Sequence, residues 1–252
     1  MIPTAADVLH SIDEFAPWDR AEAWDNTGLL AGSMDMPVRG VLCALDLSET
    51  VLAEAEKLGV DLIVAHHPIL FRGRKNLRED DPEGALLCKL VRGGFGMIAA
   101  HTNFDMASGG VNDALAKRLG LEKTLEMECG GRIGHIEETT LDMFVTRVEE
   151  KLGDKARVYG DGAKRVSRIA VMGGAGGDFV QEALRVGADV YVTGEIGYHK
   201  ALDCPQMGMA ILEAGHRATE MPAVSAMADA LRTAFRRHQY AISVNVSASA
   251  LF

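Results

Sequence analysis

Uninterrupted apolar runs alternate with helix-like spacing along the first half of the chain. The runs predicted as buried strands are 40–47, 60–65 and 96–100. A strand covered on both faces needs no alternating polar positions, which is typical of parallel sheets. The helices predicted from the apolar spacing are 4–15, 49–58, 82–92 and 110–118. Ser48 is expected to cap the second of these helices, and Gly59 is expected to end it.

A second series of elements follows the glycine-rich segment CGGRIG at 129–134. The predicted helices are 139–152, 178–186 and 220–237, and the predicted strands are 166–172, 188–193, 208–213 and 240–246. This alternation predicts an α/β fold with largely parallel or mixed sheets. We expect two related α/β domains, the first formed by residues 1–127 plus 221–252 and the second by residues 128–220.

A weak internal repeat accompanies this division. Residues 41–67 align without a gap over residues 169–195, so that Gly59 matches Gly187 and Asp61 matches Asp189. One interpretation is that any strand–helix–strand unit resembles another, and the second is that the two halves are related. The repeat is uneven in its chemistry, because the second half has Gly194 and Glu195 where the first has two histidines.

Composition and charge narrow the class of protein. The 252 residues suffice for a large core, and the net charge of −10 argues against a protein that coats nucleic acid. No apolar run reaches the roughly 18–20 residues that span a bilayer, and the N-terminus lacks the pattern of a signal peptide. The four cysteines lie far apart, which indicates buried thiols in a reducing cytoplasm rather than a disulfide framework.

Polar side chains follow three of the predicted strands. These residues are His66 and His67, then His101 and Asp105, then His216 and Glu220. Ligands of open α/β sheets bind beyond the carboxyl ends of the strands. Four imidazoles and two carboxylates suit zinc, iron, manganese or cobalt, and their number suits two ions about 3.5–4 Å apart. The sequence therefore predicts a dinuclear metal site in a cleft at the strand ends.

Each of these residues also has a structural interpretation. A histidine at a strand end is often a hydrogen-bonded core residue, and Asp105 and Glu220 are equally suited to favour helix N-termini. The last histidine and glutamate share i, i+4 spacing, but Pro222 favours a helix that starts near Thr219, so this pair is not expected in regular helix throughout.

Weaker candidates lie outside these three pairs. Glu195 and His199 follow another predicted strand, and they form either an acid/base pair near the metals or a local hydrogen-bonded pair. The glycine-rich segment 173–177 is either a phosphate cradle or a tight turn. Asp25 and Asn26 carry strong turn chemistry and are expected to hold a turn.

Five segments of the chain resemble the signatures of one known family. They are WDNTGLL (24–30), AHHPILF (65–71), HTNFDMASGGVNDALA (101–116), GADVYVTGEIGYHKA (187–201) and EAGHRATE (213–220). This set is similar to that of the NIF-three-like proteins, a family also called GTP cyclohydrolase 1 type 2. The resemblance covers nearly the whole chain, which matches the short form without an inserted domain.

The resemblance implies a two-domain α/β protein with a dinuclear metal centre, assembled as a homohexamer. It implies the same six metal ligands, His66, His67, His101, Asp105, His216 and Glu220. The implied activity is hydrolytic opening of the guanine imidazole ring by metal-activated water. The set of ligands motivates the further hypothesis that Glu195 or His199 transfers protons in this reaction.

Two classes of function therefore stay open. The first is a dinuclear metal hydrolase acting on a small molecule of the nucleotide type, in the cytoplasm and without a membrane or nucleic-acid partner. The second is a non-enzymatic protein that binds or delivers metal, or a hexameric scaffold. A third interpretation, a nucleic-acid-binding ring, would require Arg72, Arg74 and Arg78 to line one surface.

Overall fold

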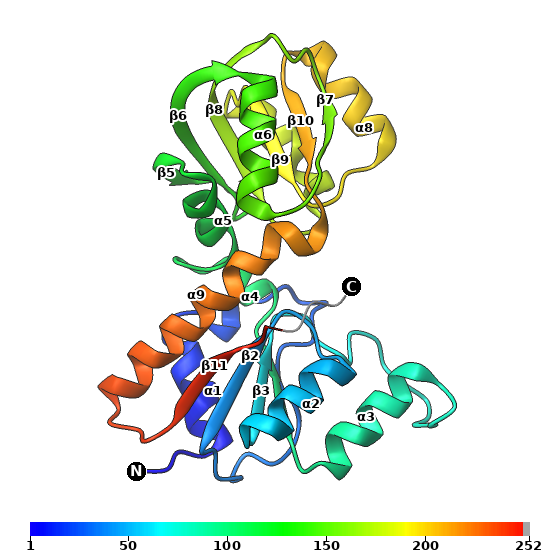
Figure 1. Cartoon of the computed structure of the whole chain (residues 1–252), viewed down its shortest axis with the longest axis vertical. Helices are drawn as coiled ribbons and strands as arrows, with labels where there is room; N and C mark the ends of the chain where they lie inside the picture. The colour runs from blue at the N-terminus through cyan, green and yellow to red at the C-terminus, as the bar shows by residue number, and fades with distance from the viewer. Residues whose placement is uncertain (249–252) are drawn as a thin grey trace. The chain divides into compact units, whose positions relative to one another are not determined.

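Two sheets organise the protein, one in each of two compact units of a computed structural model that describes residues 1–248 (Figure 1). Unit 1 comprises residues 1–107 and the chain from Val224 onward, and unit 2 comprises Ser108–Ala223. The two domains expected from the sequence, 1–127 plus 221–252 and 128–220, remain a prediction. Residues 249–252, which belong to the first of them, lie outside the part of the chain that the structure describes.

The sheet of unit 1 has the strand order β1-β4-β3-β2-β11. Four of its strands are parallel, and β1 pairs with β4 in the antiparallel direction. The strands are β1 (Gly28–Ala31), β2 (Gly40–Ala44), β3 (Leu62–Ala65), β4 (Gly96–Ala99) and β11 (Ser243–Val246). Every residue of β2, β3 and β4 is buried, as their uninterrupted apolar runs predict.

Helices cover the sheet of unit 1. They are α1 (Ala5–Asp13), α2 (Glu49–Leu58), α3 (Pro82–Arg92), the single turn α4 (Thr102–Asp105) and the 3₁₀ turn η1 (Trp18–Arg20). In the core, Leu52 of α2 and Leu90 of α3 pack against Leu42 and Ile63 of the strands. In Figure 1, α1 lies on the other side of the sheet from α2.

The sheet of unit 2 is mixed, with the strand order β5-β6-β8-β9-β10-β7. The central strands β8, β9 and β10 are parallel, and the remaining pairs are antiparallel. The strands are β5 (Glu122–Glu126), β6 (Arg132–Thr140), β7 (Arg157–Tyr159), β8 (Arg165–Met172), β9 (Val190–Thr193) and β10 (Ala210–Glu213). Strands β5, β6 and β7 are absent from the sequence-based prediction.

Helices pack on both faces of this second sheet (Figure 1). They are α5 (Val111–Leu119), α6 (Leu141–Leu152), η2 (Gly176–Phe179), α7 (Val180–Arg185), α8 (Tyr198–Asp203) and η3 (Cys204–Met207). Leu115 of α5 and Phe144 of α6 share one core cluster with the sheet, and Ala183 of α7 and Cys204 share another. The remaining helix, α9 (His216–Arg237), begins in unit 2 and continues into unit 1.

The repeated segments of the sequence have the same local structure. Val41 pairs with Leu62 in unit 1, and Ile169 pairs with Val190 in unit 2, both 128 positions later (169 − 41 and 190 − 62). Asp61 accepts a hydrogen bond from the Arg39 amide, and Asp189 accepts one from the Ser167 amide, again 128 positions later (189 − 61 and 167 − 39). The shared register and the shared carboxylate contact favour two related halves.

Among residues 1–248, no helix is both long enough and apolar enough to cross a membrane.

Candidate metal centre

The two adjacent histidines lie where β3 leaves the core of unit 1. The amide of His66 donates to the Ala44 carbonyl, and the amide of His67 donates to the Leu45 carbonyl. These two hydrogen bonds hold both histidines at the carboxyl edge of the sheet, directly after β3 ends at Ala65. His66 is fully buried, whereas His67 is partly exposed.

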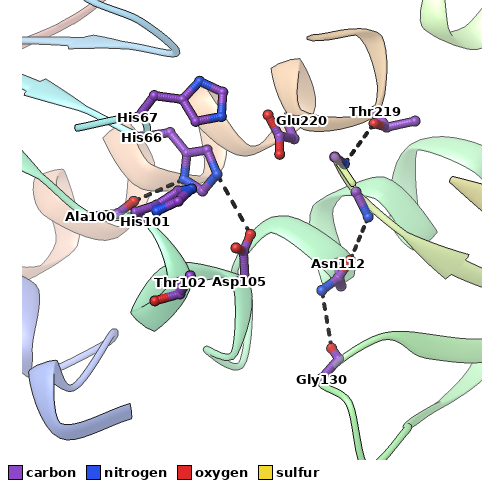
Figure 2. A network of polar contacts seen from close by, with 12 residues as sticks. His66, His67, Ala100, His101, Thr102, Asp105, Asn112, Gly130, Thr219 and Glu220 are labelled. Atoms are coloured by element: carbon purple, nitrogen blue, oxygen red, sulfur yellow. Dashed lines mark hydrogen bonds and ion pairs between the residues drawn. The ribbon is translucent and has the colours of Figure 1, made fainter. Parts of the chain in front are cut away.

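The next strand supplies a third imidazole and a carboxylate at the same edge. His101 follows β4 and precedes the single turn α4, at whose end lies Asp105. The Asp105 amide donates to the His101 carbonyl over 3.0 Å, which returns the chain by one turn. Asp105 Oδ1 lies 3.6 Å from His66 Nε2, and Figure 2 shows the His66 ring between Ala100 and Asp105.

The three histidines of unit 1 form one cluster. Each offers a ring nitrogen, and these nitrogens lie within 4.8 Å of one another. The ring centroids of His66 and His101 are 5.1 Å apart, and those of His67 and His101 are 5.5 Å apart. Three convergent imidazoles beside a carboxylate are a donor set that suits zinc and other first-row transition metals.

The Nδ1 atom of each ring is bound to an oxygen that can only accept. His66 Nδ1 lies 2.9 Å from the Ala100 carbonyl, His67 Nδ1 lies 2.8 Å from Asp46 Oδ1, and His101 Nδ1 lies 2.8 Å from Asp25 Oδ1. In a neutral imidazole one nitrogen is a donor and the other an acceptor. Donation from Nδ1 therefore leaves the Nε2 lone pair for a metal, as in most metal-binding histidines.

Asp25 has a larger role than the turn expected from the sequence. Besides His101, its carboxylate accepts hydrogen bonds from the amide and the hydroxyl of Thr102. Burial of the Asp25 side chain opposes its ionisation, but the hydrogen bonds from His101 and Thr102 outweigh burial and hold the pKa of Asp25 well below its usual range. Asp25 therefore fixes both the His101 ring and the start of α4.

In unit 2, His216 and Glu220 lie on the first turns of α9. The expectation that this helix starts near Thr219 was wrong, because α9 begins at His216 and contains Pro222. The Thr219 hydroxyl contacts the carbonyls of Gly215 and His216, which anchors the first turn. The i, i+4 spacing consequently places His216 Nε2 3.2 Å from Glu220 Oε1.

Glu195 lies beside His216 in unit 2. Its Oε1 atom is 3.0 Å from His216 Nδ1, so His216 has the same arrangement as the three histidines of unit 1. Glu195 and His199 both line a cavity whose volume is about 690 Å³. Within residues 1–248 no hydrogen bond joins these two side chains, so the local pair considered from the sequence is not formed.

In the glycine-rich segment 173–177, the absence of a side chain at Gly174 leaves space for the Glu220 side chain of α9. Gly174 has a φ of +62°, and a Cβ atom there would overlap Glu220 Oε1 and lie 3.2 Å from His216 Nε2. Its amide donates to the Thr219 hydroxyl. The loop is therefore a tight turn whose missing side chain admits the Glu220 carboxylate.

The Gly174→Ala variant should lose more stability than the Gly208→Ala variant. Both glycines have left-handed backbones, but a Cβ at Gly208 would meet nothing within 4 Å. Gly208→Ala should cost only the conformational penalty of about 1–2 kcal/mol, whereas Gly174→Ala should cost about 1–3 kcal/mol more because Glu220 must move. Urea unfolding monitored by circular dichroism measures the difference. Equal losses would show that Glu220 needs no space at Gly174.

Two carboxylates of the candidate centre were missed by sequence reasoning. The pattern of the sequence does not single out Asp46, although this residue follows the apolar run of β2 as His66 follows that of β3. Asp25 was assigned only to a turn. Their partners are 21 and 76 residues away along the chain, so only the tertiary fold brings them together.

The fold and the clustered side chains define a class of protein. It is a mixed α/β protein with two sheets, and histidines that are oriented by carboxylates and carbonyls gather at a carboxyl edge of its first sheet. Such an arrangement is a candidate metal centre.

The chain belongs to the Duf34/NIF3 (NGG1p interacting factor 3) family, whose model matches residues 3–250. A protein of Clostridium perfringens named GTP cyclohydrolase 1 type 2 homolog is 35% identical over 226 residues, which cover 86% of each chain. A protein of the same name from Clostridium acetobutylicum is 34% identical and covers 92% of this chain and 90% of its own.

A solved structure gives the same result for the fold. The crystal structure of a Bacillus cereus protein related to NIF3 has a TM-score of 0.95 and 26% identity, over 100% of this chain and 98% of that one. The comparisons confirm the family resemblance and the mixed α/β fold expected from the sequence.

Proposed function

We propose that the protein is a dinuclear metal-dependent hydrolase that acts on a nucleotide-type substrate. The proposed ligands of two divalent ions are His66, His67, His101 and Asp105 of unit 1, with His216 and Glu220 of unit 2. The imidazole and carboxylate donors suit zinc, iron, manganese or cobalt. The name of the relatives, GTP cyclohydrolase 1 type 2 homolog, makes GTP the first substrate to test.

The observation that carries this proposal is the common orientation of the histidines. In all four, Nδ1 lies within hydrogen-bonding distance of a carbonyl or carboxylate oxygen, so that a neutral ring would leave Nε2 to bind a metal. A histidine that served only to fill the core would not need the same nitrogen fixed each time. Carboxylate–histidine pairs of this kind fix the ring tautomer and raise the basicity of the ligating nitrogen.

The chain's own residues have distinct proposed roles in the reaction. A bound divalent ion would lower the pKa of water towards about 7 and so supply a nucleophile at neutral pH. Asp25 and Asp46 hold the rings of His101 and His67 in place. Glu195 is proposed to orient His216 and, together with His199, to move protons at the cavity that both residues line.

The expected partners follow from charge and from the family resemblance. Arg74 is paired with Asp81 and Glu83, and Arg78 is paired with Asp80. Because these cations are neutralised locally and the net charge is −10, a small-molecule substrate is favoured over nucleic acid. We propose the homohexameric assembly and the cytoplasmic setting on the family resemblance.

Removal of metal tests the function directly. Protein stripped with a chelator should lose GTP hydrolysis, and reloading with zinc, manganese, iron(II) or cobalt should restore hydrolysis with at least one of them. Elemental analysis of the same samples gives the metal content. Full turnover by metal-free protein would contradict the proposal, whereas bound metal without hydrolysis of any nucleotide would favour the metal-delivery or scaffold function.

A further inference from the structure

Two exposed aromatic rings stand beside the histidine cluster of unit 1. Trp24 is 61% exposed and Phe71 is 48% exposed, although both side chains are apolar. Their ring centroids are 5.8 Å apart, in an edge-to-face arrangement with an interplanar angle of 74°. Both rings also meet His101 edge to face, at 6.4 Å for Trp24 and 6.2 Å for Phe71. Trp24 and Phe71 thus form an aromatic pair at a candidate metal ligand.

The segment that orients His101 also fixes this aromatic pair. Asp25 binds His101, and the next residue, Asn26, donates from Nδ2 to the Leu70 carbonyl over 2.6 Å. The contact ties the chain beside Trp24 to the chain beside Phe71. Leaving two large apolar rings in water forgoes the free energy that their burial would contribute, so an interior packing role does not explain why the fold holds them there.

The aromatic pair of Trp24 and Phe71 is suited to bind a ligand that contains a flat ring. Aromatic side chains bind bases by stacking, which needs a π face rather than a particular set of hydrogen bonds. An edge-to-face pair leaves room for a third ring to pack on an exposed face. A phosphate group would instead require polar or charged donors, which the two side chains supply only through the indole N–H of Trp24.

We propose that Trp24 and Phe71 bind a flat heteroaromatic ring of the substrate, such as a purine base, next to His101. This inference rests on the proposed hydrolase function and names the part of the substrate that the enzyme recognises. The pair positions the ring by stacking, and the oriented histidines lie at its border.

Tryptophan fluorescence tests the inference, because the chain contains only two tryptophans, Trp18 and Trp24. In a Trp18→Phe background the emission reports on Trp24 alone. Guanosine 5′-monophosphate should change this emission in a saturable manner, and ribose 5-phosphate, which lacks the base, should not. Phe71→Leu should weaken binding of the nucleotide roughly tenfold or more. The matched control is Leu77→Ala, since Leu77 is 60% exposed and its loss should leave binding unchanged.

Calorimetry completes the test in variants that lack the reporter. Trp24→Leu should weaken binding of guanosine 5′-monophosphate as much as Phe71→Leu does, and Trp24→Phe should restore part of the affinity. Equal binding of the two probes, or nucleotide binding that neither variant changes, would overturn the inference.

The metal content of the same samples separates this inference from the proposed function. Base-dependent binding by protein that takes up no metal would support the aromatic site and contradict the hydrolase. Normal metal content without base-dependent binding would overturn the aromatic site alone.

Discussion

A variant with both His66→Ala and His67→Ala is expected to lose its bound metal, and its metal-dependent hydrolysis should fall roughly a thousandfold or more. The two rings are proposed ligands, and both lie at the end of β3 with their Nδ1 atoms already bound to oxygen. Removing them takes two of three imidazoles from the cluster of unit 1. Elemental analysis and an assay with GTP measure both losses.

A graded variant and a control sharpen this experiment. Asp46→Ala keeps the His67 ring but removes its partner, so metal affinity should fall by about 10–100-fold rather than vanish. His135→Ala is the matched control, because His135 is exposed on β6 and should leave the metal content unchanged. Wild-type metal content in the double variant would show that the histidines form only a polar network.

Local signals in the sequence were enough to place several elements. The helix predicted at 82–92 has these bounds in the structure, since Asp81 caps it, Pro82 occupies its first turn and Gly93 follows it. The helix at 49–58 likewise begins after Ser48, whose hydroxyl accepts from the Val51 amide, and ends at Gly59. Caps and breakers act over a few residues, so the sequence alone reveals them.

Elements that depend on distant partners were missed. All residues of β5 are exposed, so no apolar pattern marks it as a strand, and pairing with β6 alone defines it. The start of α9 was misplaced because a proline normally belongs to a first turn, whereas here the Thr219 contacts and the space at Gly174 favour a helix from His216. Tertiary contacts outweighed the local preference.

The candidate site also contains residues that local sequence signals predict and residues that only the fold reveals. The histidines were found because a strand that ends in polar residues leaves a visible signature in the sequence. Their partners were not, since the Asp25–His101 contact joins residues that are far apart in the chain. A ligand type can thus be predicted from spacing, but the groups that orient it require the fold.

Asp113→Ala is expected to destabilise the protein by about 3–5 kcal/mol, because it removes the carboxylate that balances the charge of the buried Arg132 guanidinium. The Arg132 side chain is 4% exposed, and its Nε and Nη2 atoms donate to the two Asp113 oxygens over 2.6 and 2.9 Å. A two-pronged pair of this kind is among the stronger hydrogen-bonded contacts. Urea unfolding followed by circular dichroism measures the loss. The control is Glu138→Ala, which breaks an exposed pair with Arg165 and should cost about 0–1 kcal/mol.

The ion pair between Asp113 and Arg132 also predicts how the stability lost in Asp113→Ala depends on pH. Burial opposes ionisation of Asp113, but hydrogen bonds from Arg132 and the Gly109 amide outweigh it and hold the folded-state pKa of Asp113 below its usual value. Stability from a lowered pKa is present above the unfolded-state pKa of about 3.9 and is lost as the pH falls through the folded-state value. The difference in unfolding free energy between wild type and Asp113→Ala should therefore be largest at pH 7 and should decrease below about pH 4. A gap that stays constant down to pH 2 would mean that packing around Asp113, and not its charge, supplies the stability.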